Sequence, residues 1–323
     1  MPAIRMPAIA CLLAVGSLAG CAACPVTHVS MDQLVAEHNA NAQGIPRLKA
    51  RAKIQLSFTD HKGRHVQWGS SSPLASPNGL LLLSKGGDAS RGDAPADPAA
   101  SKDFVLVGKE AMGVELFRIG SSASEGKYYF WYNYGDSGKA WWGWHQFAGA
   151  PQITEMPIDP NQLLSVLSVC ELPEDFTKLP TVLMRMSCNP CAYVLTYVDR
   201  QAVTGRIASK RDVYFRWSNA QPRRPFRVDL FDAGGEPVMT AQLAGYAPVA
   251  TGKPGAGQPV MPTDIRISWP ARRSSAHIVL SEPTTAEAWD TDYCRFLGEL
   301  PAGIGPEDII QVDGALDARG GQQ

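Results

Sequence analysis

Cysteine thiols are the side chains in this sequence whose spacing most clearly suggests chemistry. Cys21 follows directly on the tripeptide Leu18-Ala19-Gly20, which closes an apolar run that starts at Ala8 behind a lone basic residue. A short basic start, an apolar segment of this length and small residues before a cut are typical of an export signal. A thiol placed directly after that cut can act as a nucleophile and accept an acyl-carrying group.

The segment Leu18-Ala19-Gly20-Cys21 resembles the bacterial lipobox, in which the cysteine is acylated and the chain is cut in front of it. Two or three acyl chains hold a protein stably on a membrane, whereas one chain does so only marginally. We therefore expect residues 1–20 to be a lipoprotein signal peptide and residues 21–29 a lipidated tether. Ala22 favours the outer membrane, by resemblance to the sorting rule of enteric bacteria. The alternative is an ordinary secretory signal that ends near a cysteine.

The composition is that of an exported globular protein. Without residues 1–20, which contain one basic residue and no acidic one, the chain carries 29 basic and 31 acidic residues. This balance gives no electrostatic footprint for nucleic acid, so we expect no nucleic-acid partner. The hydrophobic fraction, 45%, is ample for a core. No second stretch approaches the roughly 18 apolar residues that span a bilayer.

Five cysteines remain once Cys11 leaves with the signal and Cys21 is acylated. Cys188 and Cys191 enclose two turn-forming residues between two strand-like runs, which predicts a turn whose ends are close enough for a disulfide. Free thiols, a redox-active pair and a zinc site are the alternatives. A redox pair normally opens a helix, and zinc requires a second pair at similar spacing. The pattern predicts no pairing for the other three: Cys24, Cys170 and Cys294.

Motifs of known enzyme classes are missing from the sequence. It contains no Gly-x-Ser-x-Gly, no His-Glu-x-x-His and no glycine-rich nucleotide loop. His61 and His65 flank a predicted turn and could share a metal, but turn histidines are far more often solvated. We therefore expect neither an enzyme nor a metal site, and no cofactor beyond the covalent lipid on Cys21.

Alternation of apolar and polar residues predicts a mainly β chain. A period of two marks a strand with one buried face. It is clearest in two runs: Ile54, Leu56, Phe58 and Phe226, Val228, Leu230. About a dozen strands in antiparallel hairpins favour a curved sheet or an incomplete β-barrel.

Helices are expected in only two or three places. One begins at Ser30, which has capping-box spacing, and another at Asp159-Pro160, a good cap and first-turn pair. Segments near 86–102 and 247–262, rich in small residues and proline, are expected to be mobile insertions.

An aromatic hairpin is predicted at the centre of the sheet. Residues 128–134 and 141–147 hold four of the eight tryptophans and four of the nine tyrosines. Aromatic rings cover their cross-strand neighbours on a pleated surface. Because both faces of this hairpin are aromatic, we expect one to be covered by the core and the other by a helix or a ligand.

The order of these elements resembles the LolA/LolB family of lipoprotein carriers and receptors, over residues 30–285. A helix leads into paired strands, and the aromatic hairpin, a proline-capped helix and further strands follow. The resemblance implies one β domain over residues 30–323, an incomplete barrel with short helices on its concave side. It also implies an apolar cavity for acyl chains of lipids or lipoproteins. The implied partners are a membrane, reached through the lipid anchor, and a periplasmic carrier, at the periplasmic side of the outer membrane.

The expected lining of that cavity comes from the alternating strands and the aromatic hairpin. It comprises Ile54, Leu56, Phe58, Phe130, Trp131, Trp142, Phe226, Val228 and Leu230. The alternative is a structural envelope lipoprotein whose sheet is filled by its own side chains. A cavity wide enough for an acyl chain distinguishes the two.

Overall fold

The computed structural model describes residues 24, 28–60, 62–69, 78–86, 102–110, 112–134, 137–148, 156–200, 207–217, 222–252, 257–296, 300–301 and 303–314. The predicted signal peptide, Cys21, and most of the predicted insertion at 86–102 lie outside these residues. The expectations for them stay predictions.

Strands dominate the described chain. They are β1 (Arg47–Thr59), β2 (His65–Trp68), β3 (Asn78–Ser84), β4 (Asp103–Lys109), β5 (Glu115–Ser122), β6 (Lys127–Tyr134), β7 (Ser137–Trp144), β8 (Thr181–Cys188), β9 (Cys191–Arg200), β10 (Ile207–Arg216), β11 (Pro225–Asp232), β12 (Pro237–Ala244), β13 (Ala247–Pro248), β14 (Val260–Met261), β15 (Asp264–Trp269), β16 (Ser274–Thr284) and β17 (Ile309–Gln311). The helices are α1 (Met31–Gln43) and α2 (Pro160–Val166), with short 3-10 turns at His145–Phe147, Thr291–Cys294 and Pro306–Asp308.

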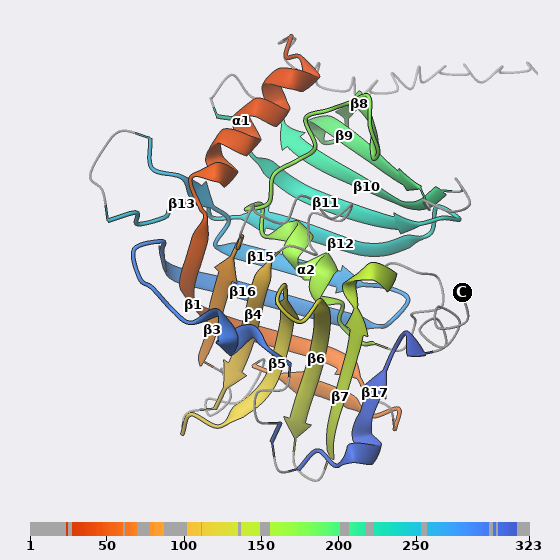
Figure 1. Cartoon of the computed structure of the whole chain (residues 1–323). Helices are drawn as coiled ribbons and strands as arrows, with labels where there is room; N and C mark the ends of the chain where they lie inside the picture. The colour runs from red at the N-terminus through yellow and green to blue at the C-terminus, as the bar shows by residue number, and fades with distance from the viewer. Residues whose placement is uncertain are drawn as a thin grey trace, which may run out of the picture.

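One 15-stranded sheet organises the molecule (Figure 1). Its order is β17-β7-β6-β5-β4-β3-β1-β16-β15-β12-β11-β10-β9-β8, with β2 paired to β1 beside this path. Neighbours are antiparallel except β17, which runs parallel to β7. β17 and β8 form its two ends and do not pair with each other, so the sheet is open. The predicted mainly β fold with an incomplete barrel is confirmed.

The sheet curves around α2. This helix contacts β5 and β6 on one arm of the sheet and β12 on the other. Five strands separate β5 from β12 in the sheet, so a single short helix can touch both only if the sheet bends around it. Figure 1 shows α2 between the upper strands β9–β12 and the lower strands β4–β7. The face of the sheet that is turned toward α2 is called the concave face below.

The helices begin where capping residues predict. Ser30 caps α1, its hydroxyl accepting a hydrogen bond from the backbone N–H of Gln33 at 3.2 Å. Asp159 caps α2, its carboxylate accepting from the N–H of Asn161 at 2.9 Å, and Pro160 fills the first helical position. Both helices bury apolar side chains in the same core as the concave face, as expected.

The C-terminal part of the chain covers the outer face of the aromatic hairpin. Phe130 of β6 points into the main core, whereas its neighbours Tyr129 and Trp131 form a separate cluster with Phe296 and Ile304. The expected cover of the second aromatic face is therefore neither a helix nor a ligand. It is the chain's own segment after β16.

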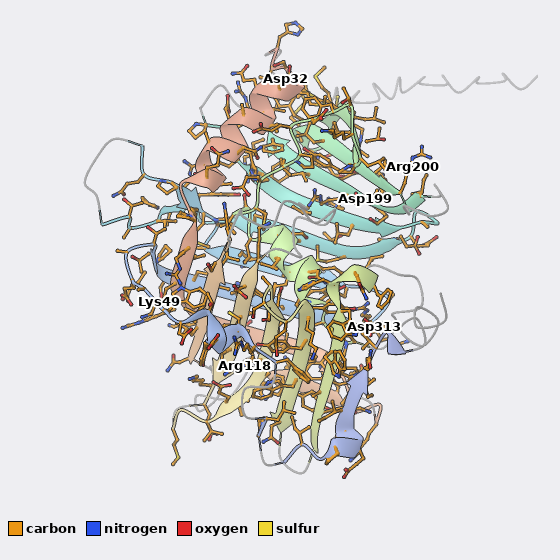
Figure 2. All side chains as sticks on the ribbon, viewed as in Figure 1. Asp32, Lys49, Arg118, Asp199, Arg200 and Asp313 are labelled. Atoms are coloured by element: carbon orange, nitrogen blue, oxygen red, sulfur yellow. A yellow bond between two sulfur atoms is a disulfide. The ribbon has the colours of Figure 1, made fainter. Side chains whose placement is uncertain are left out.

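Polar contacts fix this cover at both of its ends (Figure 2). Arg118 of β5 donates to the backbone carbonyl of Tyr293 at 3.1 Å, and its guanidinium lies 4.5 Å from the centre of the Tyr293 ring. Near the end of the described chain, the Asp313 carboxylate accepts from the backbone N–H of Trp144 at 2.6 Å. Both labelled side chains thus join the C-terminal segment to the sheet.

The predicted insertion at 247–262 packs against the fold. Its ends pair as β13 and β14, and Val249, Val260 and Met261 are buried. The Asn41 side chain of α1 makes two hydrogen bonds of 2.8 Å to the backbone of Val260. Its described residues therefore depart from the expected loop, because apolar positions at its ends found partners in the core.

Candidate functional site

The concave face carries one continuous apolar cluster. Phe58, which is fully buried, lies at its centre. Its ring centroid is 5.5 Å from that of Trp68, 5.6 Å from Phe130 and 5.1 Å from Tyr132. These separations are typical of favourable aromatic pairs.

A single stretch of chain, residues 156–172, fills the hollow of the sheet; we call it the plug segment. It contains α2 and contributes apolar side chains that are each at most 6% exposed: Met156, Ile158, Leu163, Leu164, Val166, Leu167, Val169 and Leu172. The capped start of α2 was predicted from the sequence. The family resemblance implied its position on the concave side, but the helix was expected to leave room there for an acyl chain.

Polar contacts tie the plug segment to the sheet and to α1. Gln162 accepts a hydrogen bond from the indole N–H of Trp269 in β15 at 2.8 Å. Asn39 of α1 pairs with the backbone of Leu172, donating at 2.8 Å and accepting at 2.7 Å. Lys85, just after β3, forms an ion pair of 3.0 Å with Glu171. Most of these contacts lie beyond the C-terminal end of α2, whereas Gln162 is the attachment within the helix.

His38 of α1 also contacts the plug segment. Its Nε2 lies 2.9 Å from the backbone carbonyl oxygen of Cys170. Burial, with a smaller contribution from the nearby cations Arg211 and Lys85, lowers the pKa of His38 to about 4. The ring is therefore neutral at pH 7, and since a carbonyl oxygen can only accept, Nε2 carries the proton in this bond.

Two hollows of the described fold differ in size and openness. Between the plug segment, α1 and β10–β12 lies a cavity of about 20 Å³, lined among others by His38, Ser165 and Arg211. That volume is enough for roughly one water molecule. An open groove of about 360 Å³ runs along β1, β2, β15 and β16. Its lining mixes polar and apolar side chains, among them Gln55, Leu56, Trp68, Arg266, Ile267 and His277. Neither of these two hollows of the described residues is an enclosed cavity of the size expected for an acyl chain, and the plug segment lies on the concave face where that cavity was expected.

The structure gathers six of the nine predicted lining residues on the concave face. Ile54, Leu56, Phe58, Phe130 and Val228 belong to the main cluster, and Leu230 packs against it. All nine were expected on one surface, so the other three require a correction.

Trp131, Trp142 and Phe226 do not lie on the concave face. Trp131 and Trp142 belong to the outer cluster, since successive side chains of a strand point to opposite faces. Phe226 lies beside a register shift between β10 and β11, which breaks the alternation. Its ring centroid is 6.2 Å from that of Tyr214 and 5.1 Å from the Arg216 guanidinium.

The predicted disulfide between Cys188 and Cys191 is wrong in this structure. The turn itself forms as predicted, and the two residues are direct partners in the β8–β9 pairing. Cys191 is instead joined to Cys24, 167 residues away, with the two Cα atoms 5.7 Å apart, and Cys188 is an exposed free thiol. One sulfur can enter only one disulfide, and no local sequence pattern indicates that Cys24 reaches this turn.

The described residues contain neither a membrane-spanning helix nor a metal-binding cluster. None of their helices has the length and apolar character needed to cross a membrane. No three of their histidine, cysteine or acidic side chains lie close enough together to hold a metal ion. His61 lies outside the described residues, and His65 is exposed, with its Nε2 3.3 Å from the Ser57 hydroxyl.

No protein-family model and no curated protein matches the sequence. Several solved structures are similar in fold. A proposed outer membrane lipoprotein-sorting protein domain from Vibrio parahaemolyticus has a TM-score of 0.44 and 10% identity, covering 81% of this chain and 95% of that one. A DUF1329 family protein from Desulfovibrio piger has a TM-score of 0.42 and 9% identity, covering 82% and 98%.

A LolA superfamily protein from Nitrosomonas europaea has a TM-score of 0.41 and 11% identity, covering 83% of this chain and 98% of that one. At these scores the function has to be inferred from this chain's own residues.

Proposed function

We propose that this protein is a lipid-anchored envelope protein that binds an acyl chain of a lipid or lipoprotein on the concave face of its sheet. The observation that carries the proposal is the plug segment. The centre of an otherwise continuous apolar surface is covered by a seven-residue helix and its flanks, and not by another layer of sheet. An acyl chain would take the place of α2 when that helix moves out.

The free energy lost when the side chains of α2 leave the core is similar to the free energy gained when an acyl chain is buried there. Burying one leucine or valine side chain is worth about 1.5–3 kcal/mol, so four of them contribute roughly 6–12 kcal/mol. The four that α2 and its next residue bury are Leu163, Leu164, Val166 and Leu167. At about 0.8 kcal/mol for each methylene, an acyl chain that buries roughly 8–15 methylenes gives the same free energy. A single acyl chain of common length can therefore replace the helix.

The contacts of the plug segment favour movement of α2 alone. Leu172 and Glu171 are tied to α1 and to Lys85, so the C-terminal part of the segment has a fixed end. Within α2, Gln162 supplies the hydrogen bond to the sheet. Breaking one hydrogen bond of this kind costs about 1 kcal/mol, which is small beside the apolar exchange.

The membrane part of the proposal rests on Cys21. Acylation of this residue would hold the fold at the periplasmic side of the outer membrane, where lipids or lipoproteins delivered by a periplasmic carrier are the expected ligands. The net charge of the mature chain and its lack of enzyme motifs fit a binding protein better than a nucleic-acid partner or an enzyme.

A second candidate is a structural envelope lipoprotein. The observation that favours it is the filled interior, since the enclosed cavity has room for about one water molecule. In that case the plug segment is a permanent part of the core and no acyl chain enters.

Titration with a fluorescent fatty acyl probe separates the two. A chain that starts at residue 22 keeps every described contact and needs no detergent. We expect saturable binding of the probe. Gln162→Ala should raise the affinity up to about fivefold, because loss of the hydrogen bond to Trp269, about 1 kcal/mol, makes it easier for α2 to move out. The matched control is Gln33→Ala on the exposed side of α1, which should bind like the parent protein. Folded proteins that show no saturable binding would favour the structural candidate.

A further inference from the structure

Three cysteines meet at the tip of the β8–β9 hairpin. Cys24 and Cys191 form the disulfide, and both of their sulfur atoms lie 3.7 Å from the backbone carbonyl oxygen of Cys188. Cys188 is exposed, carries a free thiol and is the direct cross-strand partner of Cys191. A free thiol thus lies beside a disulfide that shares its hairpin.

We propose that Cys24, Cys188 and Cys191 form a thiol–disulfide exchange site. The Cys188 thiolate attacks the sulfur of Cys191, the bond between Cys188 and Cys191 forms, and Cys24 leaves as a thiolate. The proton lost by Cys188 returns through solvent to Cys24. One disulfide breaks and one forms, so the step needs neither oxidant nor reductant.

The backbone geometry permits both disulfides. Directly paired residues of antiparallel strands have Cα atoms about 4.5–5.5 Å apart. A disulfide accepts Cα separations of about 4.4–6.8 Å, so the product bond across the hairpin fits as well as the present one. The register that opposes Cys188 to Cys191 need not change for the exchange.

The other free thiols stay outside this exchange. Cys294 is fully buried beneath the outer cover of β4, and burial raises the pKa of its thiol, which disfavours the reactive thiolate. Cys170 lies in the plug segment, where it lines the small cavity beside His38. The exchange is therefore confined to the three cysteines of the hairpin tip.

Exchange would change how the fold is held at the membrane; this consequence rests on the proposed acylation of Cys21. Cys24 is three residues beyond Cys21, a span of at most about 10 Å. With Cys24 bonded to Cys191, the hairpin tip is held within that distance of the acylated residue. With Cys24 released, the next described residue that is packed in the core is Val29, at most about 29 Å from Cys21 along the chain. The site would therefore set the distance between the fold and the bilayer.

The test is disulfide mapping of the full-length exported protein. Free thiols are blocked with N-ethylmaleimide at acidic pH, and the chain is digested with trypsin. Cys188 and Cys191 share the tryptic peptide 186–200, so their mutual disulfide makes that peptide lighter by two hydrogens. The present disulfide instead joins it to the peptide that contains Cys24, and the blocking group is then found on Cys188.

We expect Cys24→Ser to yield the internally closed peptide and Cys188→Ser to yield only the joined peptides. In the unaltered protein, incubation in mildly alkaline buffer without added thiol should raise the closed form several-fold at a constant number of disulfides. Two blocked thiols at Cys188 and Cys191 in Cys24→Ser would overturn the proposal, as would a closed form that stays undetectable in the unaltered protein. The mapping does not use acyl binding, and the same digest reports the acylation of Cys21, so failure of the proposed function is recognised separately.

Discussion

Trp269 of β15 donates its indole N–H to the side-chain oxygen of Gln162 in α2, at 2.8 Å. Trp269 is fully buried, so this bond satisfies a donor that water cannot reach. It also joins the short helix in the hollow of the sheet to the sheet itself. This buried polar pair therefore supports the position of α2 in addition to its large apolar contact.

Removing this pair should weaken the fold measurably. Gln162→Ala leaves the Trp269 indole buried without an acceptor, and we expect the free energy of unfolding to fall by about 1–3 kcal/mol. Urea denaturation followed by circular dichroism measures it. Gln33→Ala, on the exposed face of α1, should change stability by no more than about 0.5 kcal/mol. Equal stabilities of the two variants would show that Gln162 does not hold α2.

Two phenylalanines test the assignment of faces. Phe58 is fully buried at the centre of the concave cluster, so Phe58→Ala should cost about 3–5 kcal/mol of unfolding free energy. Phe226 is only partly buried and lies with Tyr214 outside that cluster, so Phe226→Ala should cost at most about half as much. Chemical denaturation of both variants makes the comparison, and a larger loss for Phe226→Ala would contradict the placement.

His38 makes stability depend on pH. Its pKa is lowered from 6.5 to about 4 in the folded protein, so below pH 6.5 the unfolded chain binds the proton first. Stability is then greatest above pH 6.5 and falls by about 3 kcal/mol as the pH drops toward 4. His38→Gln keeps a donor for the Cys170 carbonyl but has no charge to gain. Denaturation midpoints measured between pH 7 and 4 should lose much of their slope in this variant, and an unchanged slope would exclude His38 as the cause.

Anchoring is tested at Cys21. Because acylation needs the thiol, Cys21→Ser should block maturation or release the fold from the membrane fraction. Immunoblots of fractionated cells detect both results, and Cys24→Ser is the matched control that should stay membrane-bound. Unchanged membrane retention and maturation of Cys21→Ser would contradict a lipid anchor at this residue.

Local patterns in the sequence were enough to predict many of the strands and the starts of both helices. The alternation of Ile54, Leu56 and Phe58 gives one buried face, and Ser30 and Asp159 cap the helices where their side chains can accept backbone N–H groups. These features depend on neighbours within a few residues, so a single sequence contains them.

Long-range features of the site could not be predicted. The disulfide partner of Cys191 is 167 residues away, and no local pattern links it to the hairpin. The face of Phe226 depends on a bulge between β10 and β11, and the role of Gln162 depends on Trp269, which the chain reaches only after five further strands (β8–β12) of the main sheet. The alternation of Ile265, Ile267 and Trp269 could have indicated that Trp269 faces the core.

The most direct test of acyl binding on the concave face is cross-linking with a photoreactive fatty acyl probe, mapped by mass spectrometry. We predict cross-links at residues that surround α2, such as Phe58 and Leu164, with higher yield in Gln162→Ala. Excess unlabelled fatty acid should compete them away. Cross-links confined to the outer face, for example at Trp142, or no competed cross-link in the folded protein, would contradict acyl binding in the hollow of the sheet.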